Sequence, residues 1–314
     1  MTPACAAAAI ARRVRHVVAI VTPLLVPHAL ARAQDSIVAR GGGGGVTIAP
    51  PPPPRPAADT TVRPTGRLPF GVGEHAEYNV KFGIVRVGSG TMDITPTDSL
   101  RGHAVWHAQF HIQGGTFFYH VNDQLDSWFD VHTLSSLRFL QHLEEGGSHR
   151  QRDYEIYPER QAYVENQKPE QPSVSAPLDD AAFLYFIRTI PLVVGETLTF
   201  DRYFNPKSNP VTIRVLRRET VSVPAGKFAA IVIQPVIKTS GIFSKNGEAQ
   251  VWLSDDSARV VLQLKSKLSF GSLDLYLRSF RAAPDAPPLV YAMQAGRARP
   301  DSSNAVDSTA RAGP

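Results

Sequence analysis

The chain has 314 residues, and its 33 Lys and Arg against 28 Asp and Glu give a formal net charge of +5. Four of the basic residues, Arg12, Arg13, Arg15 and Arg32, lie in the first 33 residues, where no acidic residue occurs. The rest of the chain therefore has 29 basic and 28 acidic residues, a net charge of +1. Because it also has no basic stripe interleaved with aromatic residues, we expect no nucleic-acid partner.

Residues 1–33 have the pattern of a secretory signal peptide. A basic stretch ending at His16 precedes an apolar run over residues 17–30, and Ala31 and Ala33 are small residues at the positions that a signal peptidase reads. The apolar run is too short to span a bilayer. We expect cleavage before Gln34 and export to the periplasm or the outer envelope, with an uncleaved anchor as the alternative.

The single cysteine, Cys5, lies in this segment. The rest of the chain therefore has no disulfide, no thiolate nucleophile and no cysteine ligand for a metal. It also has no Gly-x-Ser-x-Gly, His-Glu-x-x-His or dinucleotide-binding motif. We expect no cofactor and no metal, and an enzymatic activity is the less favoured reading.

Two segments of biased composition flank the remainder. Residues 41–45 are five consecutive glycines and residues 50–54 are five consecutive prolines, which form a flexible coil and an extended rod. We expect residues 34–67 to be a disordered leader, with contact to peptidoglycan or an envelope protein as its functional alternative. Residues 282–314, rich in Ala, Pro, Arg, Asp and Ser, should be a disordered tail. The folded unit is then 68–281.

Within the folded unit, apolar residues recur at every second position, which predicts β-strands. The strands are expected at residues 76–82, 104–112, 116–125, 136–144, 151–157, 197–204, 211–223, 228–238, 248–253, 260–268 and 273–280. Short turns between successive strands require antiparallel pairing, and this many strands should curl into a barrel-like structure or split into two sub-barrels. An outer-membrane barrel also alternates, but apolar runs shorter than about 9 residues disfavour it.

Residues 178–191 predict a single helix in this mainly β fold. Asp179 or Asp180 can cap its first turn, and Pro191 ends it. Residues 182–187 leave almost no polar face, so protein should cover the helix on most sides. Arg188 then needs a carboxylate or the last helix carbonyls, and Asp126 or Asp130 is the expected partner. A structural clamp is the favoured role, and anion recognition is the alternative.

Three histidines and a glycine-rich segment suggest chemistry that their context disfavours. His103, His107 and His111 alternate with apolar residues on a strand, where positions four apart are separated by about 13 Å. One metal ion cannot span that distance, so we expect a solvated face. Residues 83–90 have the glycine spacing of a phosphate loop without its lysine or helix, which favours a hairpin where another backbone approaches closely.

Aromatic and acidic residues supply the remaining candidates. A binding site for an apolar ligand is expected to use Trp128, Tyr185, Arg188 and Trp252. Two carboxylates beside a tryptophan could instead act as the acid and base of a glycosidase, because an apolar neighbour raises the pKa of one of them. The candidate pairs are Asp126 with Asp130, and Asp255 with Asp256. Consecutive aspartates after a strand more commonly form a turn.

Several phrases along the folded unit resemble, in order and spacing, the exported bacterial family known as domain of unknown function 3108. They are Pro69-Phe70-x-Val72-Gly73-Glu74-x-x-x-Tyr78, Gly88-x-Gly90, Asp130-x-x-Thr133-Leu134, the helix at 180–188, Glu219-x-Val221-x-Val223-Pro224-Ala225-Gly226-x-Phe228 and Val251-Trp252-Leu253-Ser254-Asp255-Asp256-x-x-Arg259. The resemblance implies a β-rich, barrel-like envelope or periplasmic protein. It implies no activity, substrate or site residues.

Three functions remain open from the sequence. The first is a non-enzymatic binding or carrier module for a lipid or other amphiphile, held by a curled sheet and an apolar helix. The second is a glycan hydrolase that uses two of the four aspartates. The third is a structural or assembly partner that uses the leader and an exposed sheet edge.

Overall fold

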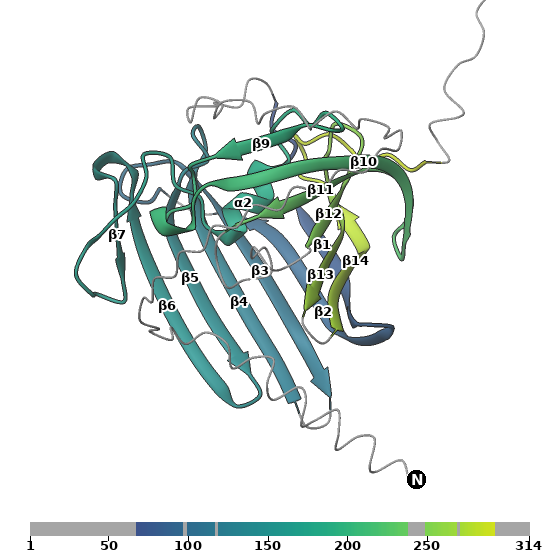
Figure 1. The fold of residues 1–314 in the computed structure, drawn as a ribbon, viewed down its shortest axis with the longest axis horizontal. Coiled ribbons are helices and arrows are strands. Elements are labelled where there is room, and N and C mark those ends of the chain that lie inside the picture. Colours follow the sequence, from purple (N-terminus) through teal and green to yellow (C-terminus); the bar gives the residue numbers. More distant parts are fainter. Residues whose placement is uncertain (1–66, 97–98, 117–118, 238–248, 269–270, 293–314) are drawn as a thin grey trace, which may run out of the picture.

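The computed structural model describes residues 67–96, 99–116, 119–237, 249–268 and 271–292 (Figure 1). The expected signal peptide and nearly all of the expected leader lie outside these residues, as does most of the expected tail. The described chain forms fourteen strands, one α-helix and two short 3-10 helices at Pro158–Arg160 and Pro206–Ser208. None of these helices is long and apolar enough to cross a membrane.

The strands follow one another with short connections, as the turn residues predict. In chain order they are β1 (His75–Phe82), β2 (Val85–Thr95), β3 (Val105–Thr116), β4 (Tyr119–Asp130), β5 (Ser136–Glu145), β6 (Ser148–Tyr157), β7 (Ala162–Glu165), β8 (Gln171–Pro172), β9 (Thr197–Phe200), β10 (Val211–Val223), β11 (Gly226–Val236), β12 (Gln250–Ser254), β13 (Val261–Leu268) and β14 (Gly271–Arg281). The helix, α2 (Asp180–Phe186), lies between β8 and β9 in the chain.

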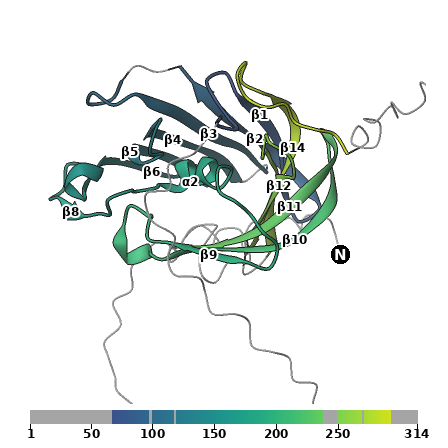
Figure 2. The ribbon, with the colours of Figure 1, turned by 90° about the horizontal axis from the view of Figure 1, so that it is seen from above.

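All fourteen strands belong to one antiparallel sheet. Its order is β8-β7-β6-β5-β4-β3-β2-β1-β14-β13-β12-β11-β10-β9, so pairing of β1 with β14 joins the two halves of the chain. The sheet curls around α2 (Figure 2). It is not closed by strands, but Leu178 donates to Arg202 O (2.5 Å) and accepts from Phe204 N (3.0 Å) near its two edges. The expected curled antiparallel sheet is confirmed, as one sheet and not two sub-barrels.

The glycine-rich segment forms the hairpin between β1 and β2. Gly83 has φ 60° and Phe82 pairs with Val85, so Gly83 takes the first central position of a two-residue turn, where type II′ hairpins favour glycine. Further along, Gly88 lies opposite Gly114 of β3, and a Cβ on Gly88 would be 2.2 Å from Gln113 O. The expected close approach of two backbones is therefore confirmed.

The helix α2 is shorter than predicted but capped as expected. Asp179 is its N-cap and accepts from Ala181 N (2.9 Å) and Ala182 N (2.8 Å). The helix ends at Phe186, before Pro191, because the next amides bond three residues back, Arg188 N to Tyr185 O and Thr189 N to Phe186 O. All residues from Ala181 to Phe186 are buried, which confirms that protein covers the helix on most sides.

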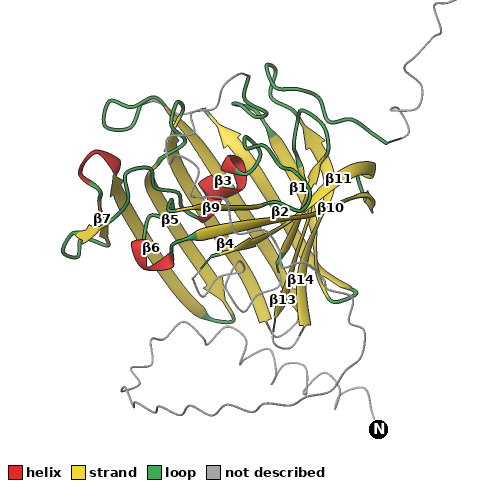
Figure 3. Cartoon of the chain, turned by 45° about the horizontal axis from the view of Figure 1, so that its top comes forward, coloured by secondary structure: helices red, strands yellow, loops and turns green. Residues whose placement is uncertain are grey.

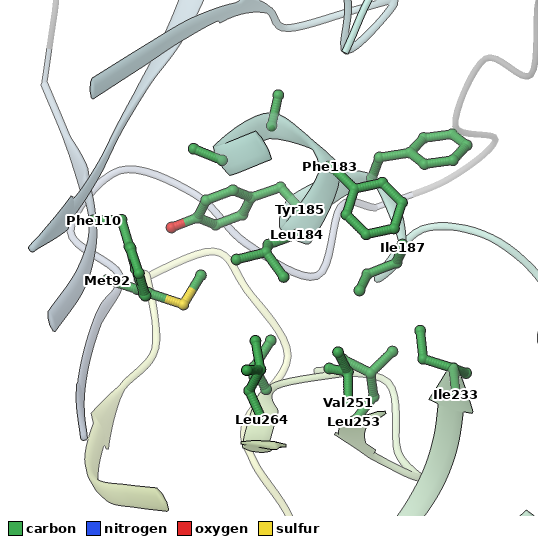
Figure 4. Packing of buried hydrophobic residues seen from close by; sticks show 14 of the residues in the cluster. Met92, Phe110, Phe183, Leu184, Tyr185, Ile187, Ile233, Val251, Leu253 and Leu264 are labelled. Carbon is green, nitrogen blue, oxygen red and sulfur yellow. The ribbon is translucent and has the colours of Figure 1, made fainter. Parts of the chain in front are cut away.

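The hydrophobic core lies between α2 and the inner face of the curled sheet (Figure 4). Side chains of α2 face residues from both halves of the sheet (Figure 4). In the first half, the ring centroids of Tyr185 and of Phe129 on β4 are 5.7 Å apart. The labelled residues of this core are Met92, Phe110, Phe183, Leu184, Tyr185, Ile187, Ile233, Val251, Leu253 and Leu264. The helix thus takes the place that a second sheet has in a sandwich.

The chain after β14 packs against the sheet as far as Ala292. Ala283 is buried, the ring of Tyr291 lies 4.8 Å from that of Phe228, and Ala292 N donates to Lys227 O (2.8 Å). The folded unit therefore extends past the expected end at residue 281.

Replacing Asp179 tests the seating of the helix. Asp179→Ala should lower the free energy of unfolding by about 2 kcal/mol, because two backbone amides and the Ser127 hydroxyl lose a buried acceptor. Asp179→Asn keeps an oxygen acceptor and should cost less than half as much. Urea denaturation measures both values, and equal losses for Ala and Asn would show that the cap is not the source of the stability.

Candidate functional site

The four residues expected to bind a ligand lie in three separate places. Tyr185 and Arg188 are buried on the helical segment inside the curled sheet. Trp128 faces outward from β4, and Trp252 of β12 belongs to the outer face of the other half of the sheet. The structure therefore brings only Tyr185 and Arg188 together.

Arg188 forms a buried ion pair with Glu74. Nη1 donates to Oε1 (2.6 Å) and Nη2 to Oε2 (2.9 Å), and Nη2 also donates to Pro69 O (2.9 Å) and Ala258 O (3.1 Å). Burial alone would lower the pKa of Arg188, but the carboxylate of Glu74 outweighs it and holds the pKa above its ordinary value. This arrangement is a structural clamp that ties the helical segment to the start of β1.

The expectation that Arg188 pairs with Asp126 or Asp130 is wrong. Both aspartates lie on the outer face of β4, whereas α2 packs on its inner face, where Ser127 donates to Asp179 (2.6 Å). Glu74 is 114 residues away in sequence, and no local pattern connects it to the helix. Both Nη atoms of the guanidinium are engaged, and Nε is buried without a hydrogen-bond partner among the described residues.

The four candidate acids are all held by turns, amides or ion pairs. The side chain of Asp130 accepts from His132 N (2.9 Å) and Thr133 N (2.8 Å), so it stabilises the turn that follows β4. Asp256 accepts from Ala258 N (3.0 Å), Arg259 N (3.1 Å) and Val290 N (2.8 Å). Asp255 pairs with Arg218 Nε at 2.8 Å.

Asp126 is the most enclosed of the four. It accepts from the ring of His107 (2.8 Å) and from the amides of Gln109 (2.8 Å) and Gln124 (2.7 Å). Burial alone would raise the pKa of Asp126, but these hydrogen bonds outweigh it and leave the pKa below its ordinary value. A carboxyl with a lowered pKa is ionised at neutral pH, so it cannot be the proton donor of a glycosidase.

His107 lies in a row that crosses the outer face of the sheet. Thr95, His107, Trp128, Arg138 and Glu155 are successive partners on β2 to β6. The ring of His107 stacks on Trp128 with centroids 4.2 Å apart. The guanidinium carbon of Arg138 also lies over the Trp128 ring, 5.3 Å from its centroid.

The histidines that share this strand were expected to be solvated. His107 is not, because its side chain is only 16% exposed between Thr95, Trp128 and Asp126. Among the described residues, no three His, Cys, Asp or Glu side chains lie close enough to hold a metal ion.

Trp252 is buried on the outer face of the second half. Its Nε1 donates to Glu219, and Arg217 and Lys265 lie 5.9 and 5.4 Å from its ring. Hydrogen bonds from Arg217 and Trp252 lower the pKa of Glu219. Because its donor and its ring faces are occupied by neighbours, this indole holds strands together.

The inner face of β3 to β6 continues beyond α2 (Figure 1). Ser127 and Phe129 of β4 contact the helical segment. Nearer the other end of these strands, four inward side chains are only half-buried: Ile112, Val121, Leu125 and Leu143. Their inward direction follows from cross-strand pairing, because they lie in the rows that contain the buried residues Tyr78, Val80 and Phe110. We call these four residues the inner strip.

Polar side chains lie within and beside the inner strip. Asp123 points inward between Ile112 and Leu143 and accepts from Glu144 N (3.1 Å), and Arg150 is the partner of Leu143 on β6. Gln141 pairs with Leu125 across β4 and β5, and its buried Oε1 has no hydrogen-bond partner among the described residues. Arg152 is the next residue of this row on β6 and is half-buried. It approaches Tyr154, whose pKa burial raises to about 12 although the charge of Arg152 opposes the rise. Aliphatic side chains interrupted by a carboxylate and bordered by an amide and two arginines suit an amphiphile rather than a pure hydrocarbon.

Sequence reasoning missed this strip for a specific reason. Alternation shows that Gln141 and Leu143 of β5 share one face, but it shows neither that Leu125 of β4 joins them nor which face turns inward. Only the pairing of β3 to β6 with the buried core rows assigns it.

Comparison with known proteins supports the sequence resemblance. A model for a family described as "Protein of unknown function (DUF3108)" matches residues 77–278, which run from β1 to β14 and include the whole sheet except the first residues of β1 and the last residues of β14. The chain belongs to the DUF3108 family. No curated protein matches the sequence.

Several solved structures are similar to this DUF3108 chain. A beta-barrel-like protein of domain DUF1849 from Brucella abortus is 10% identical, covers 70% of this chain and 100% of its own, and has a TM-score of 0.46. A "putative lipoprotein" from Parabacteroides distasonis ATCC 8503 is 12% identical, with 69% and 100% covered and a TM-score of 0.32. The hypothetical protein CT021 from Chlamydia trachomatis is 8% identical, with 70% and 93% covered and a TM-score of 0.32. At these values the comparison adds nothing on ligand or activity.

Breaking the clamp should be costly. Glu74→Gln leaves the guanidinium of Arg188 buried without its counter-charge, so the free energy of unfolding should fall by about 3 kcal/mol or more. The matched control is Glu170→Gln, which changes a half-exposed pair with Arg160 (2.8 Å) and should leave the free energy of unfolding nearly unchanged, because water screens that pair. Denaturant titration of both variants decides the point; equal losses would contradict the clamp.

The lowered pKa of Asp126 predicts a pH dependence. Its contribution to stability is present above the unfolded pKa and is lost as pH falls through the folded pKa. Asp126→Asn should therefore lower the free energy of unfolding by about 1 kcal/mol at neutral pH, and the difference from the parent should shrink below about pH 4. Asp201→Asn, at an exposed position, is the control. A difference that stays constant with pH would contradict the assignment.

Proposed function

We propose that this DUF3108 protein is an exported, non-enzymatic carrier that holds an apolar or amphiphilic ligand against the inner strip. The observation that carries the proposal is the change in burial of the side chains along the inner face of the sheet. Near α2 the inward residues are fully buried, whereas Ile112, Val121, Leu125 and Leu143 on the same strands stay half-buried. Water meets aliphatic surface there, and a bound hydrocarbon chain would remove it at about 0.8 kcal/mol per buried CH₂ group.

The polar neighbours of the strip support an amphiphile over a pure hydrocarbon. Gln141 Oε1 is buried without a partner among the described residues, and an unsatisfied buried acceptor costs free energy until a donor arrives. A hydroxyl or amide on the ligand would satisfy it. Arg152, one strand away, would face an anionic or polar head.

The signal-peptide pattern supports export, and the envelope is where lipid has to cross an aqueous space. The same pattern leaves the periplasm and the outer envelope equally open as destinations.

The hydrolase is the weaker proposal. It requires two of Asp126, Asp130, Asp255 and Asp256 to converge as a free acid and base. Each is instead bound by backbone amides, side-chain amides or a cation, and the pKa of Asp126 and of Asp130 is lowered by hydrogen bonds that outweigh burial.

Strand addition by an assembly partner is disfavoured at only one of the two edges of the sheet, because at the other edge β9 pairs with no more than Val211–Arg214 of the longer β10. The edge strand β8 has two residues, one of them Pro172, and a short edge that contains proline resists strand addition. The leader, the other expected contact, lies outside the described residues.

A charge on the inner strip should abolish ligand binding. The parent protein is titrated with a fluorescent C16 fatty acid, and Leu143→Asp should weaken binding about tenfold or more because it replaces an aliphatic contact by a second carboxylate directly opposite Asp123. The matched control is Leu140→Asp, on the same strand and also half-buried, but on the outer face. It should bind like the parent.

Two further results would overturn the proposal. One is equal binding by the Leu143 and Leu140 variants when both are folded by circular dichroism. The other is native mass spectrometry of protein purified from the envelope that detects no bound amphiphile in any preparation.

A further inference from the structure

The tip of the β1–β2 hairpin exposes two large apolar side chains. Ile84 is 95% exposed and Val85 is 60% exposed, the two highest values among the large hydrophobic residues that the structure describes. They are adjacent and lie at the end of the hairpin, which projects at the lower right of Figure 1 and is seen from a second side in Figure 3.

The fold does not require an apolar residue at this tip. Gly83, with φ 60°, satisfies the turn, and Ile84 occupies the other central position, where the side chain contacts almost nothing. An isoleucine at that position costs solubility and gains no packing, so its role lies outside the folded chain.

Two cations flank the tip. Lys81 and Arg86 are direct partners across β1 and β2, and like charges placed opposite each other destabilise a strand pair. On its other side Lys81 is the direct partner of Asp274 on β14, but neither Lys81 nor Arg86 forms an ion pair within the described residues. Lys81 lies 4.9 Å from the ring of Tyr276, and Lys265 lies 5.8 Å from the same ring.

We propose that the β1–β2 hairpin docks on a lipid bilayer with anionic headgroups, with Ile84 and Val85 entering the interface and Lys81 and Arg86 at the headgroups. Apolar residues at a projecting tip with basic residues directly behind them are the arrangement that such an interface favours. The repulsion between Lys81 and Arg86 is relieved when phosphate lies between them.

The charge beside the tip distinguishes it from other exposed apolar residues. Val193 and Val194, 52% and 40% exposed, lie in the loop after α2 and are followed by Glu196. That pair has no flanking cation in sequence, so it serves as a matched control.

The hairpin and the inner strip lie at the same end of the sheet. Gly88, behind the tip, pairs with Gly114, and Gly114 pairs with Val121 of the inner strip. A docked hairpin would therefore bring the half-buried strip toward the bilayer. The docking proposal rests on the hairpin alone and stands if the protein binds no lipid inside.

Co-sedimentation with vesicles tests the docking. The exported protein should bind vesicles of phosphatidylcholine and phosphatidylglycerol and bind pure phosphatidylcholine at least about tenfold more weakly. Ile84→Asp/Val85→Asp should lose at least about tenfold in binding to the anionic vesicles, and Lys81→Gln/Arg86→Gln should lose a similar factor. Val193→Asp/Val194→Asp should bind like the parent.

The remaining arms separate this proposal from its rivals. Leu143→Asp should leave vesicle binding unchanged, so that failure of internal ligand binding and failure of docking are read independently. Docking is overturned if the hairpin variants bind the anionic vesicles like the parent. It is also overturned if light scattering shows a dimer that Ile84→Asp/Val85→Asp dissociates, because the tip then contacts a second copy of the chain.

Discussion

The buried ion pair between Arg188 and Glu74 is the contact on which the arrangement of helix and sheet depends. A helix of seven residues is not stable by itself in water, so its stability has to come from tertiary contacts. Its N-terminus is tied to β4 and β5 through Asp179, Ser127 and Ser136, and its far end is tied to β1 through Arg188. Since β1 is the strand that joins the two halves of the sheet, the two ends of the helical segment fix both halves around one core.

Most strands and the helix are predictable from local pattern. Period-two alternation locates nearly every long strand, because a strand with one solvent-exposed and one buried face has polar and apolar residues at alternate positions. The short β7 and β8 are not predictable, since four and two residues carry no period. The sequence pattern predicts that the helix ends at Pro191. In the structure the amides of Arg188 and Thr189 bond three residues back, so the helix ends before the proline is reached.

The candidate site was less predictable than the fold, because it depends on which face of each strand turns inward. Leu140 and Leu143 have similar neighbours in sequence and similar exposure, yet they lie on opposite faces. His107 was expected in solvent, but the neighbours that cover it, Thr95 and Trp128, come from the strands on either side. Partners separated by many residues, such as Glu74 and Arg188, leave no trace in local composition.

The length of the helix relative to the strands gives the inner strip its physical origin. At 1.5 Å per residue, seven helical residues span about 10 Å, whereas the twelve residues of β3 span roughly 40 Å. Even if the helix lay along the strands it would cover only part of them, and it contacts the part that contains Ser127 and Phe129. The rest of the inner face carries the inner strip together with inward polar residues such as Asp123 and Gln141, and this helix does not bury them. A helix much shorter than the strands around it packs one end of the curled sheet more tightly than the other, and this difference in length accounts for the half-buried apolar side chains of the inner strip among the described residues.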